Sequence, residues 1–258
     1  HAYMYSHDSA EKNWVLDYIK VWADRANANA GYMPDNVGLS GKVGEYNDGK
    51  WWGGYYGWRW PHGLMTIMEP LTNAVMNAVL LTGDYSYLDV ARQQFDKNWE
   101  LRKVEGDRVL VPHRHFDSGW GDYRDASPRH LIYLWTTSLD DQDLNRISAI
   151  PRTEDWSKVI IPGKPGHNTL GYKHFIANTL SWFEFIQGRL PDFPKEILKA
   201  NLELIDIHLH RMRSKIGNQE NWDSYSPETT DVIIELRYGT IQHKQMRSEL
   251  KEQCVHRK

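Results

Sequence analysis

The spacing of apolar residues predicts an all-α fold for this chain of 258 residues. Apolar residues recur at helical intervals over long segments, and two pairs of such segments are joined by short connections. Long loops rich in aromatic and charged residues separate these pairs. The pattern indicates an (α/α) toroid, in which helical hairpins form a ring and the loops at one end build a cleft. With about four hairpin units or part-units, the ring is expected to be incomplete.

The first expected helix covers residues 9–29. Trp14, Tyr18 and Trp22 lie on one face of this segment, and Ser9 is a residue type that caps helix N-termini. The aromatic face is therefore expected to pack against the next helices.

A helical hairpin is expected over residues 69–102. Its first helix, 69–82, begins near Pro70, which is tolerated in a first turn, and stops at Gly83. Asp84 then provides a capping side chain for the second helix. The very short connection requires the two helices to run antiparallel.

Further segments show the same apolar spacing: 128–138, 140–149, 169–187 and 195–214. The last two form a second expected hairpin, because Pro191 and Pro194 separate them. Long connections are expected over 31–63, 103–127, 150–168 and 216–230. Within these connections only Arg108–His113 resembles a strand.

Composition excludes several classes of protein. A net charge of −3 gives no overall attraction to nucleic acid or to anionic membranes. Cys254 is the one cysteine, which excludes an intrachain disulfide or a cysteine-rich zinc site. No apolar run approaches the roughly 20 residues that span a bilayer, so a soluble chain is expected.

The toroid domain is expected over residues 1–237. Residues 238–258 are rich in Gln and Lys with little apolar patterning, which predicts a disordered or foreign tail. The chain begins at His1 with neither an initiating Met nor a signal peptide, so we expect a processed chain or a fragment of a secreted or periplasmic protein.

Residues 41–63 carry the strongest functional signal. Four of the chain's 12 tryptophans lie within ten residues of this segment, which also contains seven glycines that preclude a helix. Flat aromatic rings on a polar loop suit the apolar faces of sugars. The expected sugar-binding rings are Trp51, Trp52, Tyr56, Trp58 and Trp60. Alternatively, these rings form a small core that anchors the loop, and both interpretations can hold together.

The loops are richer in the groups of a lyase than in those of a hydrolase. A lyase acting at a uronic acid needs a base, a group that neutralises the carboxylate, and an acid for the leaving oxygen. The candidate bases are His62, His115 and His167, with Tyr172 as the acid. The groups expected to neutralise or bind the carboxylate are Arg59, Arg114 and Asn168.

A hydrolase would instead use paired carboxyl groups. The available carboxylates are Glu45, Asp48, Asp117, Asp122 and Asp125. A third alternative is a fragment that binds carbohydrate without catalysis. No Walker-type phosphate loop, dinucleotide fingerprint or Gly-x-Ser-x-Gly elbow is present.

A divalent cation such as calcium is one further alternative. If residues 108–115 are extended, His113 and His115 share a face with Asp117 nearby. A third protein ligand cannot be identified from the sequence, so neither a metal nor another cofactor is expected.

Residues 42–63, Pro112–Trp120 and Gly166–His174 resemble carbohydrate-active α/α-toroid enzymes, most closely the L-rhamnose-α-1,4-D-glucuronate lyases (polysaccharide lyase family 27). The resemblance implies a toroid with an added β domain, export, and β-elimination at rhamnose-capped glucuronate of arabinogalactan-type glycans. The chain lacks a β-rich C-terminal domain and a full ring, so the candidate residues are chosen by chemistry. The expected partner is a polysaccharide or oligosaccharide, with neither nucleic acid nor membrane.

Overall fold

The structure, a computed structural model, describes residues 2–54, 56–60, 63–161 and 178–215. The chain divides into two compact units, His1–Arg152 and Thr153–Lys258. The expected domain 1–237 therefore extends across both units.

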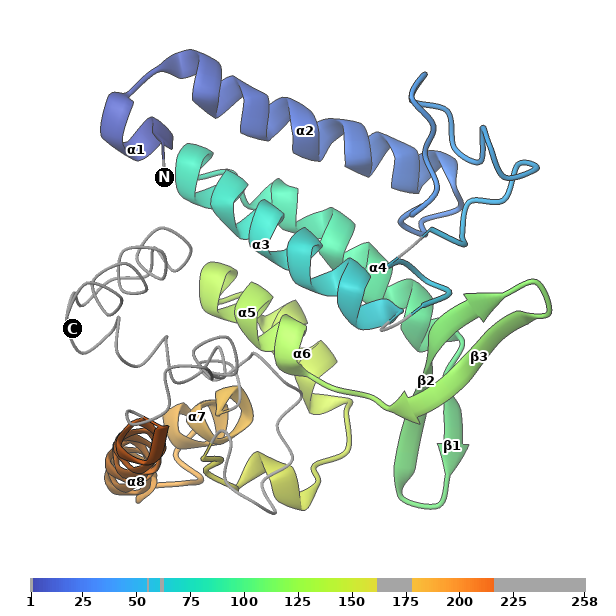
Figure 1. The fold of residues 1–258 in the computed structure, drawn as a ribbon. Coiled ribbons are helices and arrows are strands. Elements are labelled where there is room, and N and C mark those ends of the chain that lie inside the picture. Colours follow the sequence, from blue (N-terminus) through green and yellow to red (C-terminus); the bar gives the residue numbers. More distant parts are fainter. Residues whose placement is uncertain (1, 55, 61–62, 162–177, 216–258) are drawn as a thin grey trace. The chain divides into compact units, whose positions relative to one another are not determined.

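Helices make up most of the first unit. Their bounds are α1 (Ala2–Ser6), α2 (Ser9–Ala28), α3 (Leu64–Thr82), α4 (Asp89–Glu100), α5 (Arg129–Ser138) and α6 (Asp141–Ser148), with a short 3-10 helix, η1 (Tyr85–Leu88), before α4. Helix α3 is central, because it packs against α2, α4 and α5 (Figure 1). This arrangement confirms helices close to 9–29, 128–138 and 140–149.

Helix α3 supplies much of the core of this unit. Ile67, Leu71 and Val75 lie on its buried face, and the helix ends at Gly83, whose φ of +74° suits glycine. It begins five residues earlier than expected, so Pro70 lies inside the helix instead of in its first turn. Helix α3 is long and apolar enough to cross a membrane. The core helices of soluble proteins often have the same length and hydropathy.

The expected hairpin over 69–102 forms, with one local difference. The Asp84 side chain accepts a 2.9 Å hydrogen bond from the Ser86 N–H, as expected of a cap, but η1 comes before α4. Two ion pairs then join α4 to α6. Asp143, which is fully buried, lies 2.6 Å from Arg92 Nη2, and Arg146 Nε lies 2.9 Å from Asp96.

The prediction of an all-α toroid is wrong, because residues 103–125 form a three-stranded antiparallel sheet. The strands β1 (Lys103–Glu105), β2 (Arg108–Phe116) and β3 (Gly119–Asp125) are adjacent in chain order (Figure 1). Two-residue connections join them, and Gly106 and Gly119 have φ values of +60° and +102°. Tight turns with glycine at positive φ are typical of β-hairpins. The prediction of a long loop over 103–127 did not take these glycines into account.

The described residues between α2 and α3, 29–54, 56–60 and 63, form no helix. The N–H groups of Asp35 and Asn36 both donate to the Trp51 carbonyl, at 3.0 and 3.3 Å. The segment 36–50 is thereby closed at its base as a compact loop.

The second unit contains η2 (Glu154–Trp156), α7 (Thr179–Ile186) and α8 (Phe193–Lys215). Trp156 packs edge-on against Phe183 of α7, with ring centroids 6.3 Å apart. Helix α8 begins two residues before the expected start, with Pro194 in its first turn, where proline is tolerated. The start of the expected helix 169–187 and the expected tail 238–258 lie outside the described residues.

Two histidines of the first unit are shielded from water: His113 is buried, and His130 is half-buried. His130 of α5 has its Nδ1 3.4 Å from the Thr72 hydroxyl of α3, and burial lowers the pKa of His130 to about 4. Burial likewise lowers the pKa of His113 on β2 to about 4. Both side chains are therefore neutral in the folded protein at neutral pH.

We expect stability to fall as the pH drops from about 6.5 to about 4, because the unfolded chain takes up protons that the folded chain excludes. The loss should be on the order of 3 kcal/mol per histidine. Urea unfolding at several pH values measures it. His130→Gln should reduce the loss, whereas the same change at exposed His7 should not. An unchanged pH dependence in His130→Gln would contradict this assignment.

Candidate functional site

Six rings from two parts of the first unit form one aromatic cluster. We call the set the tryptophan cluster: Tyr32, Trp51, Trp52, Trp58, His115 and Trp120. Neighbouring ring centroids lie 4.3 to 6.1 Å apart. Four members come from the loop 29–63, while His115 of β2 and Trp120 of β3 are a cross-strand pair. The cluster thus fastens the loop to the sheet.

Asp35 positions the part of the loop that carries the tryptophans. Its carboxylate accepts hydrogen bonds from the N–H groups of Gly54, at 3.1 Å, and of Trp58. A Cβ atom at Gly57 would lie 1.8 Å from Asp35 Oδ2, so only glycine permits this approach. Burial raises the pKa of the Asp35 carboxyl, and the bonds from the loop N–H groups oppose that rise.

Trp58 belongs to the core and cannot act as a sugar platform. Its side chain is 0% exposed, and its indole N–H donates a 2.7 Å hydrogen bond to the Met33 carbonyl. The Trp58 carbonyl in turn accepts a 3.3 Å bond from the His115 N–H. For this ring the interpretation as a small core is correct, and the expected role in substrate binding is not.

Other rings of the segment remain accessible. Trp51, Trp52 and Trp120 are half-buried, so part of each ring faces outward. Tyr56 and Trp60 are 54% and 47% exposed, with ring centroids 5.6 Å apart. The role of these two rings in binding sugar stays a prediction.

Two cations lie beside the cluster around one carboxylate. Lys50 Nζ is 3.2 Å from Asp117 Oδ1, and this bond is the main reason that the pKa of Asp117 is lowered. Arg59, which is exposed, lies near enough to lower the same pKa. The Trp52 indole N–H contributes in the same direction without reaching normal hydrogen-bond geometry. Two positive charges therefore face one negative charge.

His115 is the one candidate base that the structure describes. Its ring is half-buried, and the ring centroid lies 4.3 Å from that of Trp52. Burial lowers the pKa of His115, and the nearby Asp117 opposes this effect. Its buried Nδ1 has no hydrogen-bond partner in the described part of the chain. The imidazole is therefore neutral at neutral pH and able to accept a proton.

Arg114 forms an ion pair with Asp122, away from His115. The extended backbone of β2 places it on the face opposite His115, as expected, and its Nε lies 3.1 Å from Asp122 Oδ2. Asp122 also pairs with Arg124 at 2.6 Å. The Arg114 guanidinium thus balances a carboxylate of the protein itself.

The cation alternative gains no support from the geometry. Within residues 2–54, 56–60, 63–161 and 178–215, no three side chains of His, Cys, Asp or Glu are grouped to hold a metal ion. His113 is buried within the sheet, and Asp117 is occupied by Lys50.

Four candidate residues lie outside the described residues: His62, His167, Asn168 and Tyr172. The expected meeting of three histidines at one cleft thus stays a prediction.

Sequence reasoning missed two residues that build the site. Tyr32 stacks on Trp51 with an interplanar angle of 12°, and Asp35 holds the loop. The available signal was the Met33-Pro34-Asp35 sequence just after a helix end, where proline and aspartate are typical turn residues.

The family of the chain follows from comparison with protein-family models. The model described as Domain of unknown function (DUF8034) matches residues 1–109 and 101–235. The chain belongs to this family. No curated protein and no solved structure matches the chain. The resemblance to rhamnose-glucuronate lyases is therefore a prediction that these comparisons do not test.

Trp58→Phe should destabilise the first unit by about 1–3 kcal/mol, because the change leaves the buried Met33 carbonyl without its donor. Chemical denaturation followed by circular dichroism measures the loss. The matched change Trp60→Phe, at an exposed ring, should cost much less. Equal losses for the two variants would contradict the role assigned to Trp58.

Proposed function

We propose that the chain is a polysaccharide lyase that cleaves at a uronic acid by β-elimination, with its substrate bound at the tryptophan cluster. One observation supports this proposal most. A neutral, half-buried imidazole, His115, lies among outward-facing indole rings beside a carboxylate with two cations, Lys50 and Arg59. Glucuronate, as in rhamnose-capped arabinogalactan, is the proposed sugar acid.

The local charge favours an acidic sugar over a neutral one. Lys50 and Arg59 together carry two positive charges, and Asp117 offsets one of them. The remaining positive charge is available to a substrate carboxylate. Neutralising that carboxylate is also what makes the adjacent C5 proton acidic enough to remove.

The aromatic rings supply the rest of the binding surface. Apolar faces of sugar rings pack on indole and phenol rings, and hydroxyl groups reach polar side chains around them. Trp51, Trp52 and Trp120 border His115, while Tyr56 and Trp60 offer a second exposed surface. A chain of several sugars, as in an oligosaccharide, suits such an extended surface.

The proposed reaction uses His115 as the base. The imidazole takes the C5 proton, the electron pair forms the C4–C5 double bond, and the C4–O bond breaks. The leaving oxygen takes a proton from an acid, for which Tyr172 stays the candidate from the sequence. A proton acceptor must be neutral before it can act, and the lowered pKa of His115 preserves the neutral form in mildly acidic solution. A glycan substrate of this kind fits a secreted or periplasmic protein.

A hydrolase is a weaker candidate at this site. Its general acid must stay protonated near neutral pH, which requires a raised pKa. Arg and Lys partners lower the pKa values of Asp117, Asp122 and Asp125. These three carboxylates are thus suited to ion pairing and not to donating a proton.

Binding without catalysis is the second candidate function. The dense packing of the tryptophan cluster favours it, because rigid aromatic surfaces are sufficient for sugar recognition. This alternative predicts affinity for oligosaccharides with no cleavage.

His115→Gln should abolish cleavage of glucuronate-bearing arabinogalactan while substrate binding persists, because glutamine retains polarity but cannot serve as the base. Cleavage is followed by the ultraviolet absorbance of the new C4–C5 double bond, and binding by titration calorimetry. His7→Gln, at an exposed histidine, should retain activity. New reducing ends without that absorbance would indicate a hydrolase, and binding without either signal would indicate a non-catalytic module.

Lys50→Gln and Asp117→Asn should change the affinity for acidic oligosaccharides in opposite directions. Loss of the lysine charge should weaken binding, and loss of the carboxylate should strengthen it. Each change in affinity should be only about three- to tenfold, because the pair is exposed to solvent. Calorimetry at low and high salt measures both, and the difference should shrink at high salt. Shifts in the same direction would contradict the charge argument.

A further inference from the structure

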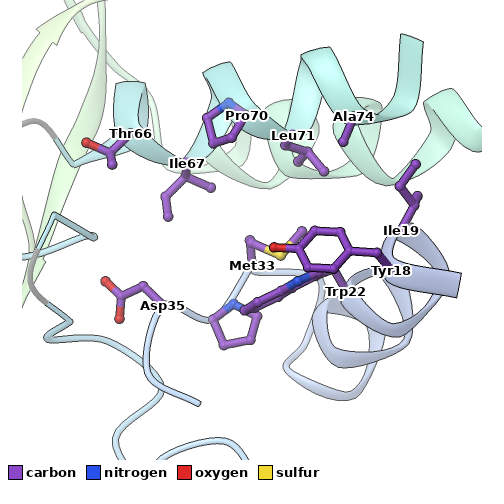
Figure 2. Close-up of a pocket in the computed structure, with 11 residues that line it drawn as sticks. Tyr18, Ile19, Trp22, Met33, Asp35, Thr66, Ile67, Pro70, Leu71 and Ala74 are labelled. Carbon is purple, nitrogen blue, oxygen red and sulfur yellow. The ribbon is translucent and has the colours of Figure 1, made fainter. Parts of the chain in front are cut away.

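A pocket between α2 and α3 is separate from the tryptophan cluster. Its volume is about 210 Å³. Figure 2 shows α3 on one side, with Ile67, Pro70 and Leu71, and Tyr18 and Trp22 of α2 on the other. Tyr18 is 51% exposed, so the pocket opens to the surface at this ring.

The body of the pocket is apolar. Aliphatic and aromatic side chains form most of its wall, including Ile19, Met33 and Leu71. A dry cavity of roughly 150 Å³ with such a lining is large enough for benzene. The larger volume here suits one ring that carries a short side chain.

One end of the pocket is polar and rich in hydrogen-bond acceptors. Asp35 and Thr66 lie together at this end, away from Ala74 (Figure 2). The Asp35 oxygens accept from the N–H groups of Gly54 and Trp58, and the two oxygens of a carboxylate together offer about four acceptor sites. The Thr66 hydroxyl, which Figure 2 places at this end, can accept a further hydrogen bond.

We propose that this pocket binds a small organic ammonium whose single apolar ring lies between α2 and α3 and whose charged nitrogen lies at Asp35 and Thr66. An ammonium group has three donors and no acceptor, which complements a carboxylate and a hydroxyl oxygen. The rings of Tyr18 and Trp22 add a surface that attracts cations. Arg25 already lies 4.8 Å from the Trp22 ring centroid, so the ammonium is best placed at the Asp35 end.

The proposal is independent of the acidic-sugar site, because the two ligands differ in charge and contact different residues. Asp35 nevertheless belongs to both regions of the fold, since its carboxylate also holds Gly54 and Trp58. Variants for the test must therefore include one that leaves Asp35 in place.

The experiment compares three probes of the same shape by titration calorimetry: phenethylamine, the neutral phenethyl alcohol and the anionic phenylpropionate. Phenethylamine should bind about tenfold tighter than the alcohol, because charge-assisted hydrogen bonds to a carboxylate are stronger than neutral ones. Phenylpropionate should bind least. Equal affinities, tighter binding of the anion, or no binding of any probe would overturn the proposal.

Two substitutions locate the binding. Ala74→Phe places a ring in the pocket and should abolish binding of the amine, whereas Asn73→Phe adds the same ring at an exposed neighbouring position and should not. Asp35→Asn should remove the preference for the amine over the alcohol. If Asp35→Asn fails to fold, the Ala74→Phe comparison decides, and retention of binding in that variant contradicts the proposal.

Discussion

The half-buried carboxylate of Asp35 is the interaction on which the first unit most depends. A loop of more than 30 residues between α2 and α3 has few regular backbone bonds, and the N–H groups of Gly54 and Trp58 need acceptors. Asp35 supplies both from one side chain. The loop can then bring its indole rings against β2 and β3, and the same carboxylate ends the apolar pocket beside α3.

Charged side chains and a neutral imidazole lie beside the aromatic rings of the tryptophan cluster, an unusual combination for a hydrophobic core. A core excludes charge, yet Lys50, Arg59 and Asp117 surround the edge of the aromatic cluster, and a neutral imidazole lies within it. Trp58, the one buried ring of the cluster, holds the geometry, and the half-buried rings are partly exposed. This division explains how one tryptophan-rich segment can stabilise the fold and still leave aromatic rings at the surface.

The sequence predicted the helices well and the sheet poorly, for a physical reason. The apolar residues of a helix such as α3 recur over many positions along the chain. Capping residues such as Asp84, which precedes η1, mark where helices begin. Strand β2 contains the one segment, Arg108–His113, that resembled a strand in the sequence, whereas β1 is exposed throughout and β3 is half-buried along most of its length. Neither β1 nor β3 shows the alternation of buried and exposed residues that marks a strand. Periodicity also cannot show that Trp58 faces inward, since that depends on a bond to Met33 far away in sequence.

The segment 36–50 is closed at its base, because its two ends meet at the Trp51 carbonyl. Its interior is also tied to the rings that follow, since the Asn47 side-chain amide donates a 3.0 Å hydrogen bond to the Trp52 carbonyl. Lys50 lies at the downstream end of the segment, beside Asp117. A substitution inside the segment can therefore be transmitted both to the Trp52 backbone through Asn47 and to the exposed charge pair through Lys50.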